Sequence, residues 1–224
     1  MTDKRRPTVT SRLRHRILEM PEEIRTASGI VINGRRIKSL VFTTDIAIIR
    51  NCDADAVLAI YPFTPQQTIS DAIIRNASMP VFCGVGGGTT NGIRSTLLAT
   101  DAEAQGAMAL VVNAPMSNQD IQRIARNVDI PVVVTVLTEH TDVDARLDAG
   151  ASILYVCAAG RTPEVVAAIR SRHPDVPIIA TGGPTPADIL RTVAAGANAI
   201  SYTPPTTKEL FSTMMEDYRS REDP

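Results

Sequence analysis

The segment Thr138–Thr141 places a carboxylate, Glu139, beside an imidazole, His140, directly after an apolar run. Histidine titrates near neutral pH, and a neighbouring carboxylate can share or orient its proton, so this pair suits general acid–base catalysis. The alternative is that both side chains cap the next helix and face water. The other two histidines, His15 and His173, do not follow a predicted strand.

Four other polar residues follow apolar runs elsewhere in the chain. Asp45 is either a general base or the N-cap of a helix, and its position favours the cap. Asn113 could steady an enolate or carbonyl oxygen. Tyr61 could stack on a ligand or hydrogen-bond to it, and Arg161 could supply positive charge. We therefore include all four among the candidate site residues.

Two segments near the end of the chain could hold an anion. Thr181-Gly182-Gly183-Pro184 and Tyr202-Thr203-Pro204-Pro205 each follow an apolar run and lead into a predicted helix. Backbone amides and helix N-termini form concave anion sites, and glycine lets an oxygen approach the backbone closely. We predict an anion or phosphate site at Thr181, Gly182, Gly183, Tyr202 and Thr203. Prolines after Thr203 remove amide donors and would narrow that site.

A third glycine-rich segment contains Gly86, Gly87 and Gly88. Three consecutive glycines cost conformational entropy, which suggests that the backbone there approaches a ligand closely. The spacing matches neither a P-loop nor a dinucleotide-binding fingerprint. A mobile loop or a bulge is the alternative.

These residues must be positioned by a repeated framework. Eight short apolar runs alternate with helix-like segments such as Ser117–Val128 and Thr162–Arg172. Continuous apolar runs are typical of strands buried on both faces of a parallel sheet, and eight strand–helix units predict closure into a barrel. The predicted strands are Ser39–Phe42, Ala56–Tyr61, Pro80–Gly84, Ala107–Asn113, Pro131–Leu137, Ser152–Cys157, Pro177–Thr181 and Ala199–Tyr202. A doubly wound open sheet is the rival fold.

The predicted fold is thus an α/β protein, a (β/α)8 TIM barrel over residues 39–224, preceded by an extension over residues 1–38. Val9–Met20 reads as an amphipathic helix. Ile30–Leu40 reads as a β-hairpin turning at Asn33-Gly34, a preferred type I′ pair. We expect this extension to pack on the barrel and plug its N-terminal mouth.

Within that framework, the closing segment Ile178–Ala199 resembles the phosphate-binding TIM-barrel enzymes. This group includes thiamine-phosphate synthase, the 2-keto-3-deoxy-6-phosphogluconate aldolases and N-acetylmannosamine-6-phosphate epimerase. The resemblance implies that Gly182, Gly183 and the backbone around Thr203 hold a phosphate. The chain departs from the group after the eighth strand, where a Gly-Ser or Gly-Thr pair is usual and Tyr202-Thr203 stands instead.

The composition of the chain limits the kinds of partner that we expect it to bind. The net charge of −1 gives no electrostatic case for nucleic acid or an anionic membrane, and no apolar run is long enough to span a bilayer. The three cysteines lack zinc-site spacing, and their odd, small number argues against a disulfide framework. We therefore expect a cytoplasmic protein. Strand ends without a His-x-His pair or a carboxylate cluster predict no metal, and a sixth strand without lysine disfavours Schiff-base aldolase chemistry. A homo-oligomer stays open.

Two classes of function remain. The first is an enzyme, of isomerase, epimerase or lyase type, that moves a proton on a small phosphorylated or otherwise anionic metabolite through Glu139, His140 or Asp45 without a cofactor. The second is a ligand-sensing barrel that binds and does not catalyse. An FMN-dependent oxidoreductase and a hydrolase are further alternatives, since FMN phosphate uses the same two loops in related barrels.

Overall fold

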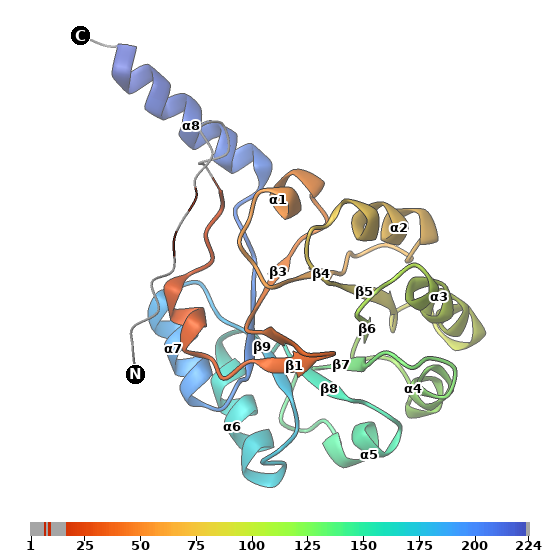
Figure 1. Ribbon diagram of the computed structural model, residues 1–224. Helices are drawn as coiled ribbons and strands as arrows, with labels where there is room; N and C mark the ends of the chain where they lie inside the picture. The colour runs from red at the N-terminus through yellow and green to blue at the C-terminus, as the bar shows by residue number, and fades with distance from the viewer. Residues whose placement is uncertain (1–6, 8, 10–16, 223–224) are drawn as a thin grey trace.

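The computed structural model describes residue 7, residue 9 and residues 17–222, and eight of its strands close into a parallel barrel (Figure 1). The barrel strands follow one another in chain order, and the last pairs with the first. This confirms the (β/α)8 prediction, and the open-sheet alternative is wrong. The strands are β3 (Ser39–Phe42), β4 (Ala56–Ala59), β5 (Val81–Gly86), β6 (Ala109–Val112), β7 (Val132–Val136), β8 (Ile153–Val156), β9 (Ile178–Thr181) and β10 (Ala199–Tyr202).

One helix follows each barrel strand, and most of these helices form an outer ring around the sheet (Figure 1). Short 3₁₀ segments lie before the barrel (η1, Glu22–Thr26) and after β8 (η2, Ala159–Arg161). The helices are α1 (Ile46–Arg50), α2 (Gln67–Asn76), α3 (Gly92–Ala104), α4 (Asn118–Ala125), α5 (Val143–Asp148), α6 (Thr162–Arg172), α7 (Pro186–Ala194) and α8 (Thr207–Glu222).

The barrel strands from β5 to β10 are preceded in turn by a proline and by a turn at a glycine. The carbonyls of Pro80, Pro131 and Pro177 accept hydrogen bonds from the neighbouring strand at 2.8, 2.9 and 3.0 Å, so each proline joins the sheet at the start of a strand although it has no amide to donate. Before β6, β8 and β10 the chain turns through glycines with φ of +101°, +105° and +110°, which are Gly106, Gly150 and Gly196. Residues with a Cβ rarely adopt that conformation, so each glycine ends a helix cleanly.

The barrel divides its apolar residues between two packed layers. Alternate residues along each strand, such as Leu40, Leu58 and Phe82, fill the interior, whereas their neighbours pack under the helices. Both faces are therefore buried, which explains the continuous apolar runs in the sequence.

The predicted hairpin is present and closes the N-terminal mouth of the barrel. Strands β1 (Ile30–Ile32) and β2 (Arg35–Ile37) pair antiparallel around Asn33 and Gly34, whose φ values are +48° and +78°. Ile30, Ile32 and Ile37 are buried in the same cluster as the barrel interior. Figure 1 shows the hairpin crossing the mouth of the barrel.

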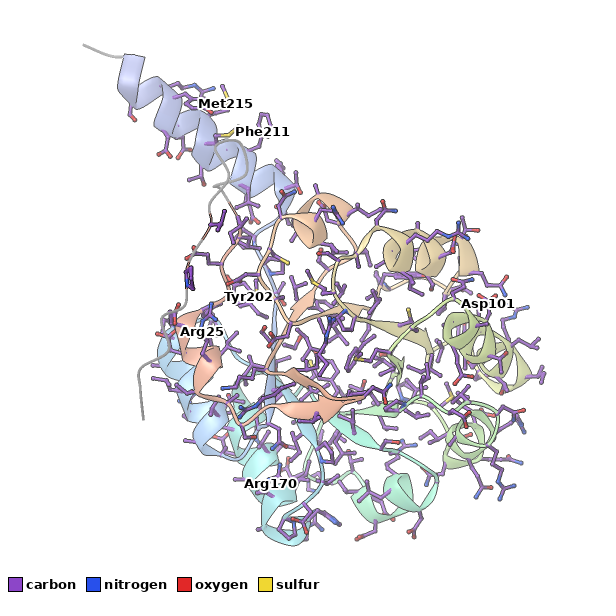
Figure 2. All side chains as sticks on the ribbon, in the orientation of Figure 1. Arg25, Asp101, Arg170, Tyr202, Phe211 and Met215 are labelled. Carbon is purple, nitrogen blue, oxygen red and sulfur yellow. The ribbon has the colours of Figure 1, made fainter. Side chains whose placement is uncertain are left out.

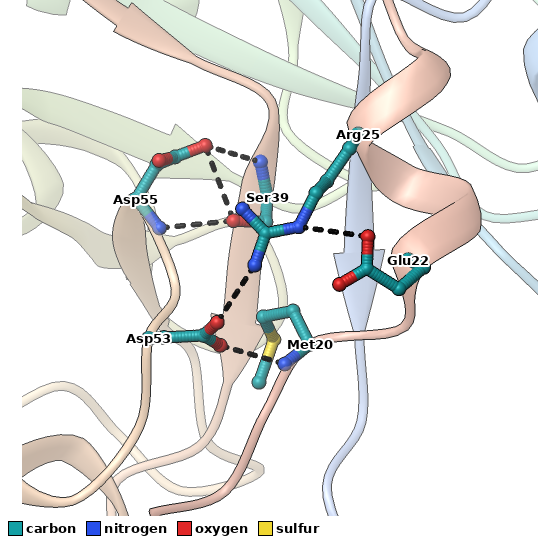
Figure 3. Close-up of polar contacts among 6 residues, drawn as sticks. All are labelled: Met20, Glu22, Arg25, Ser39, Asp53 and Asp55. Carbon is teal, nitrogen blue, oxygen red and sulfur yellow. Dashed lines mark hydrogen bonds and ion pairs between the residues drawn. The ribbon is translucent and has the colours of Figure 1, made fainter. Parts of the chain in front are cut away.

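The predicted helix Val9–Met20 falls mainly outside the described residues, and its last four residues are not helical. Leu18 instead forms a parallel β-bridge with Cys52. The backbone there is extended because Asp53 fixes it: the Met20 amide donates to one carboxylate oxygen at 2.6 Å, and Arg25 donates to the other at 3.0 Å (Figure 3). For Ile17–Met20 the helix prediction is wrong.

A second carboxylate ties the hairpin to the barrel. Asp55, just before β4, accepts a hydrogen bond from the Lys38 amide at 2.8 Å. It also accepts from the amide and the hydroxyl of Ser39, at 3.0 and 3.2 Å (Figure 3). The extension is thus anchored by buried isoleucines and by bonds at its junction with β3.

Helix α8 extends away from the barrel (Figure 1). Figure 2 shows Phe211 and Met215 on this projecting helix, outside the ring of helices, and 58% of Phe211 is exposed. No helix within residues 17–222 has the length and apolar character that a bilayer span requires.

Candidate functional site

A cavity of about 1060 Å³ opens at the carboxyl ends of β8, β9 and β10. All five residues predicted to bind an anion line it, namely Thr181, Gly182, Gly183, Tyr202 and Thr203. The parallel strands bring them together because the loops after β9 and β10 lie side by side. Whether they bind an anion stays a prediction.

The turn after β9 requires glycine. Gly183 has a φ of +80°, and a Cβ there would lie 2.6 Å from the Cβ of Asp188. The Gly182 amide donates to the Ser201 carbonyl at 3.3 Å, which holds the turn against β10. The two glycines are therefore needed for the packing of the turn, and they also expose backbone to the cavity.

Both helices at this cavity are already capped by their own residues. At α7, the Thr185 hydroxyl and amide donate to the Asp188 carboxylate at 2.6 and 3.2 Å. At α8, the Thr206 amide and hydroxyl donate to Glu209 at 2.7 and 2.8 Å. These carboxylates occupy positions that an incoming anion would otherwise use, because helix N-termini attract negative charge.

These bonds keep both carboxylates ionised. The Thr185 side chain lowers the pKa of Asp188, and the Thr206 amide lowers the pKa of Glu209. Arg191 partly offsets the charge with an ion pair to Asp188 at 2.8 Å. Sequence reasoning missed these residues, although Thr-x-x-Asp and Thr-x-x-Glu are capping-box signals.

The floor of this cavity carries two hydroxyl groups, that of Thr181, which the sequence predicted, and that of Ser201, which sequence reasoning missed. Ser201 and Thr181 are paired on adjacent strands, and the phenol of buried Tyr155 donates to Ser201 Oγ at 3.3 Å. Cys157 lines the same cavity, and burial raises the pKa of its thiol, which disfavours a thiolate.

A second, smaller cavity of about 280 Å³ lies at the ends of β4, β5 and β6. It brings together Tyr61, Asn113, Gly86 and Gly88, four of the residues predicted to contact a ligand. The hydroxyl of Tyr61 accepts a hydrogen bond from the Gln66 amide at 2.8 Å, which fixes the ring. Two groups of predicted residues thus gather in two separately lined cavities.

Gly87 packs on the backbone of Asn113 instead of lining this cavity. Its φ is +112°, and a Cβ there would lie 2.6 Å from both the nitrogen and the oxygen of Asn113. The Asn113 amide donates to the Gly86 carbonyl at 2.9 Å. The glycine run therefore has a packing role in addition to any contact with a ligand.

Glu139 and His140 lie at the rim and line neither of these cavities. Arg161 donates to Glu139 at 2.5 Å, and Nε2 of His140 is 3.8 Å from the same carboxylate oxygen. The backbone amide of Glu139 and the Arg161 side chain lower the pKa of Glu139. His140, with 87% of its side chain exposed, lines a third depression between the loops before α4 and α5.

Asp45 is the N-cap of α1. One carboxylate oxygen accepts from the amides of Ala47 and Ile48 at 2.8 and 3.3 Å, and the other accepts from the hydroxyl of Thr207. The bond from Thr207 lowers the pKa of Asp45. The cap interpretation is confirmed.

No family model and no curated protein matches this chain. Many solved structures match in fold, among them the following three. A phosphonopyruvate hydrolase in complex with oxalate and Mg²⁺ is 16% identical (TM-score 0.62), over 86% of this chain and 84% of the other. An oxaloacetate acetylhydrolase in complex with its product oxalate is 12% identical (TM-score 0.63), over 85% and 84%. A 2,3-dimethylmalate lyase of the PEP mutase/isocitrate lyase superfamily is 14% identical (TM-score 0.59), over 82% of each chain.

These likenesses establish the barrel fold. They come from enzymes other than the phosphate-binding families that the closing segment resembles, so that finer assignment is not supported. Among the described residues, no cluster of three His, Cys, Asp or Glu side chains could hold a metal ion. The two carboxylates that line the large cavity, Asp188 and Glu209, each accept hydrogen bonds at the start of a helix, so they are not arranged as a shared pair of Mg²⁺ ligands.

Proposed function

We propose that the protein is an enzyme that binds a small anionic metabolite in the cavity at the ends of β8, β9 and β10. The observation that carries this proposal is the cavity itself, of about 1060 Å³, at the end of the barrel where TIM-barrel enzymes bind their substrates. Its size suits a small molecule. The fold neighbours that carry oxalate support an anionic ligand.

The proposed chemistry is proton transfer of the isomerase, epimerase or lyase type. Glu139 is the candidate base because its lowered pKa keeps it ionised at neutral pH, and Arg161 would hold it at the rim. Arg191 lines the cavity and could supply positive charge to the ligand, although its side chain forms an ion pair with Asp188. That no cofactor takes part, FMN included, stays a prediction.

A ligand-sensing barrel is the second candidate, and one observation favours it. None of the three predicted proton carriers, Asp45, Glu139 and His140, lines the large cavity. Asp45 is committed to capping α1, and Glu139 is engaged with Arg161. A barrel whose cavity lacks these groups can bind a ligand without turning it over.

Isothermal titration with oxalate and with inorganic phosphate tests the binding site. Thr203→Trp fills the large cavity from an exposed position, and Thr138→Trp is the matched control in the third depression. We expect Thr203→Trp to weaken anion binding by at least about tenfold, equivalent to about 1.4 kcal/mol, and Thr138→Trp to leave it unchanged.

Failure of the wild-type protein to bind either anion, or loss of binding only in Thr138→Trp, contradicts the proposed site. Turnover assays with oxaloacetate and phosphonopyruvate then separate the two candidates. An enzyme loses turnover in Glu139→Gln and keeps ligand affinity, whereas a sensing barrel shows no turnover in the wild type.

A further inference from the structure

The floor of the large cavity presents two hydroxyl groups on adjacent strands. Thr181 is the last residue of β9, and its Cα partner on β10 is Ser201. Both residues line the cavity, and Ser201 is only 5% exposed. A hydroxyl has one hydrogen to donate and two lone pairs to accept with, so its remaining capacity can be counted once its fixed partners are known.

The Ser201 hydroxyl can donate its hydrogen to a ligand in the cavity. The Tyr155 phenol donates to Ser201 Oγ, which uses one lone pair of the serine. Burial raises the pKa of Tyr155, so the phenol keeps the hydrogen that it donates. Within residues 17–222 the structure gives the Ser201 hydroxyl no acceptor, so Ser201 is a hydrogen-bond donor toward the ligand.

Thr181 is a hydrogen-bond acceptor toward the cavity, because Thr162, the first residue of α6, takes its hydrogen. The Thr162 hydroxyl donates to the Ala159 carbonyl at 2.9 Å and accepts from the Ala158 amide at 3.1 Å. Its one hydrogen is therefore used. In the 3.0 Å contact between the two threonines, Thr181 must be the donor, which leaves only lone pairs of Thr181 for the cavity.

A ligand group at this floor meets a donor and an acceptor side by side. An ionised carboxylate or phosphate has only acceptor atoms, so it would satisfy Ser201 and face the lone pairs of Thr181. A hydroxyl satisfies both, since it accepts from Ser201 and donates to Thr181. The carboxylates of Asp188 and Glu209 also line the cavity, so its wall already carries negative charge.

We infer that the substrate carries a hydroxyl group that binds between Ser201 and Thr181, in addition to its anionic group. This inference rests on the proposed function, because it takes the large cavity as the substrate site. Tyr155 and Thr162 are positioning residues in this arrangement, since each fixes the hydrogen of the hydroxyl that touches the ligand. The substrate class is therefore a hydroxy acid or its phosphorylated equivalent.

Matched pairs of acids that differ by one hydroxyl test the inference. The pairs are lactate and propionate, malate and succinate, and glycolate and acetate, with dissociation constants from isothermal titration. We expect the hydroxy member of at least one pair to bind about two- to tenfold more tightly, as one added hydrogen-bonded group allows. Succinamate against succinate tests whether a primary amide occupies the floor instead.

Variants locate the effect. Ser201→Ala and Thr181→Val should each reduce the preference toward one, and Thr181→Ser should keep it because the hydroxyl remains. Tyr155→Phe and Thr162→Val should weaken the preference without removing anion binding. Thermal unfolding of each variant identifies any that fail to fold, and Thr181→Ser keeps the test valid if Thr181→Val does.

The outcomes separate the two proposals. Equal binding within every pair, or a preference that survives both Ser201→Ala and Thr181→Val, overturns the hydroxyl site and leaves the anion site standing. A preference for succinamate larger than any hydroxyl preference also overturns it. If no acid of any pair binds, and oxalate and phosphate do not bind either, the proposed function itself fails.

Discussion

Asp45 and Thr207 are 162 residues apart in sequence, and the hydroxyl of Thr207 donates to the carboxylate of Asp45. The same carboxylate caps α1, so the start of the first barrel helix is joined to the start of α8. The sequence presented Asp45 as either a base or a cap. Its contacts assign it to the framework that holds the carboxyl end of the barrel together.

Asp45→Ala should therefore destabilise the protein, by about 1 kcal/mol as for other lost N-caps. Asp45→Asn should cost less, because an asparagine oxygen still accepts from the amides of α1. Urea unfolding of the three proteins at pH 7 measures both effects. Equal stability of wild type and Asp45→Ala would contradict the cap.

The effect should depend on pH in a defined direction. The folded-state pKa of Asp45 lies below its ordinary value of 3.8. The stability that the charged cap adds is thus fully present above that ordinary value and is lost as pH falls through the lowered pKa. The difference between wild type and Asp45→Ala should shrink when unfolding is repeated at about pH 3 or below. A difference that grows on acidification would contradict this sign.

Glu139 gives a second prediction based on charge. Arg161→Gln removes an ion pair and a hydrogen bond, so the pKa of Glu139 should rise toward its ordinary value of 4.5 while the bond to its own amide remains. A carbon-detected NMR titration of the Glu139 carboxyl measures this shift directly. His140→Ala is the control, because the imidazole is farther away, at 3.8 Å, and should change that pKa less.

The predictability of this molecule differs between its framework and its site. Buried strands were found from the apolar runs, because a parallel barrel buries both faces of each strand. The turn at Asn33-Gly34 was found because few residue pairs suit its backbone. By contrast, Arg161 meets Glu139 across 22 residues and Tyr155 meets Ser201 across 46, and nothing in the local sequence records either pairing.

Local signals that were present could have improved the site prediction. Thr185 and Asp188 form a capping box visible in the sequence, as do Thr206 and Glu209. Together they indicate that both helix N-termini at the predicted anion site have carboxylates of their own. The helix predicted before the hairpin failed for Ile17–Met20 for a different reason, since Asp53 binds the extended Met20 backbone from a distant loop.

Gly87 and Gly88 should respond very differently to the same substitution. Gly87→Ala puts a methyl group against the Asn113 backbone at a φ of +112°, which should cost about 1–3 kcal/mol of stability and displace Asn113 from the small cavity. Gly88→Ala meets open space, so its thermal unfolding should match that of the wild type. If the two variants unfold alike, the packing role of Gly87 is wrong.

The hairpin supplies the last prediction, which concerns the extension rather than the site. Ile37 is 1% exposed and packs with the interior of the barrel, whereas Val31, on the paired strand, is 66% exposed. Ile37→Ala leaves a cavity at the plugged mouth and should lower the free energy of unfolding by about 2–5 kcal/mol. Val31→Ala should change it by less than about 0.5 kcal/mol.

Denaturant unfolding followed by circular dichroism measures both hairpin variants. Because Ile37 contacts the barrel interior, its loss should weaken the whole barrel, so the single cooperative transition should move to lower denaturant. A separate early transition in Ile37→Ala, with the main transition unmoved, would mean that residues 1–38 fold apart from the barrel. The hairpin would then add nothing to the stability of the barrel.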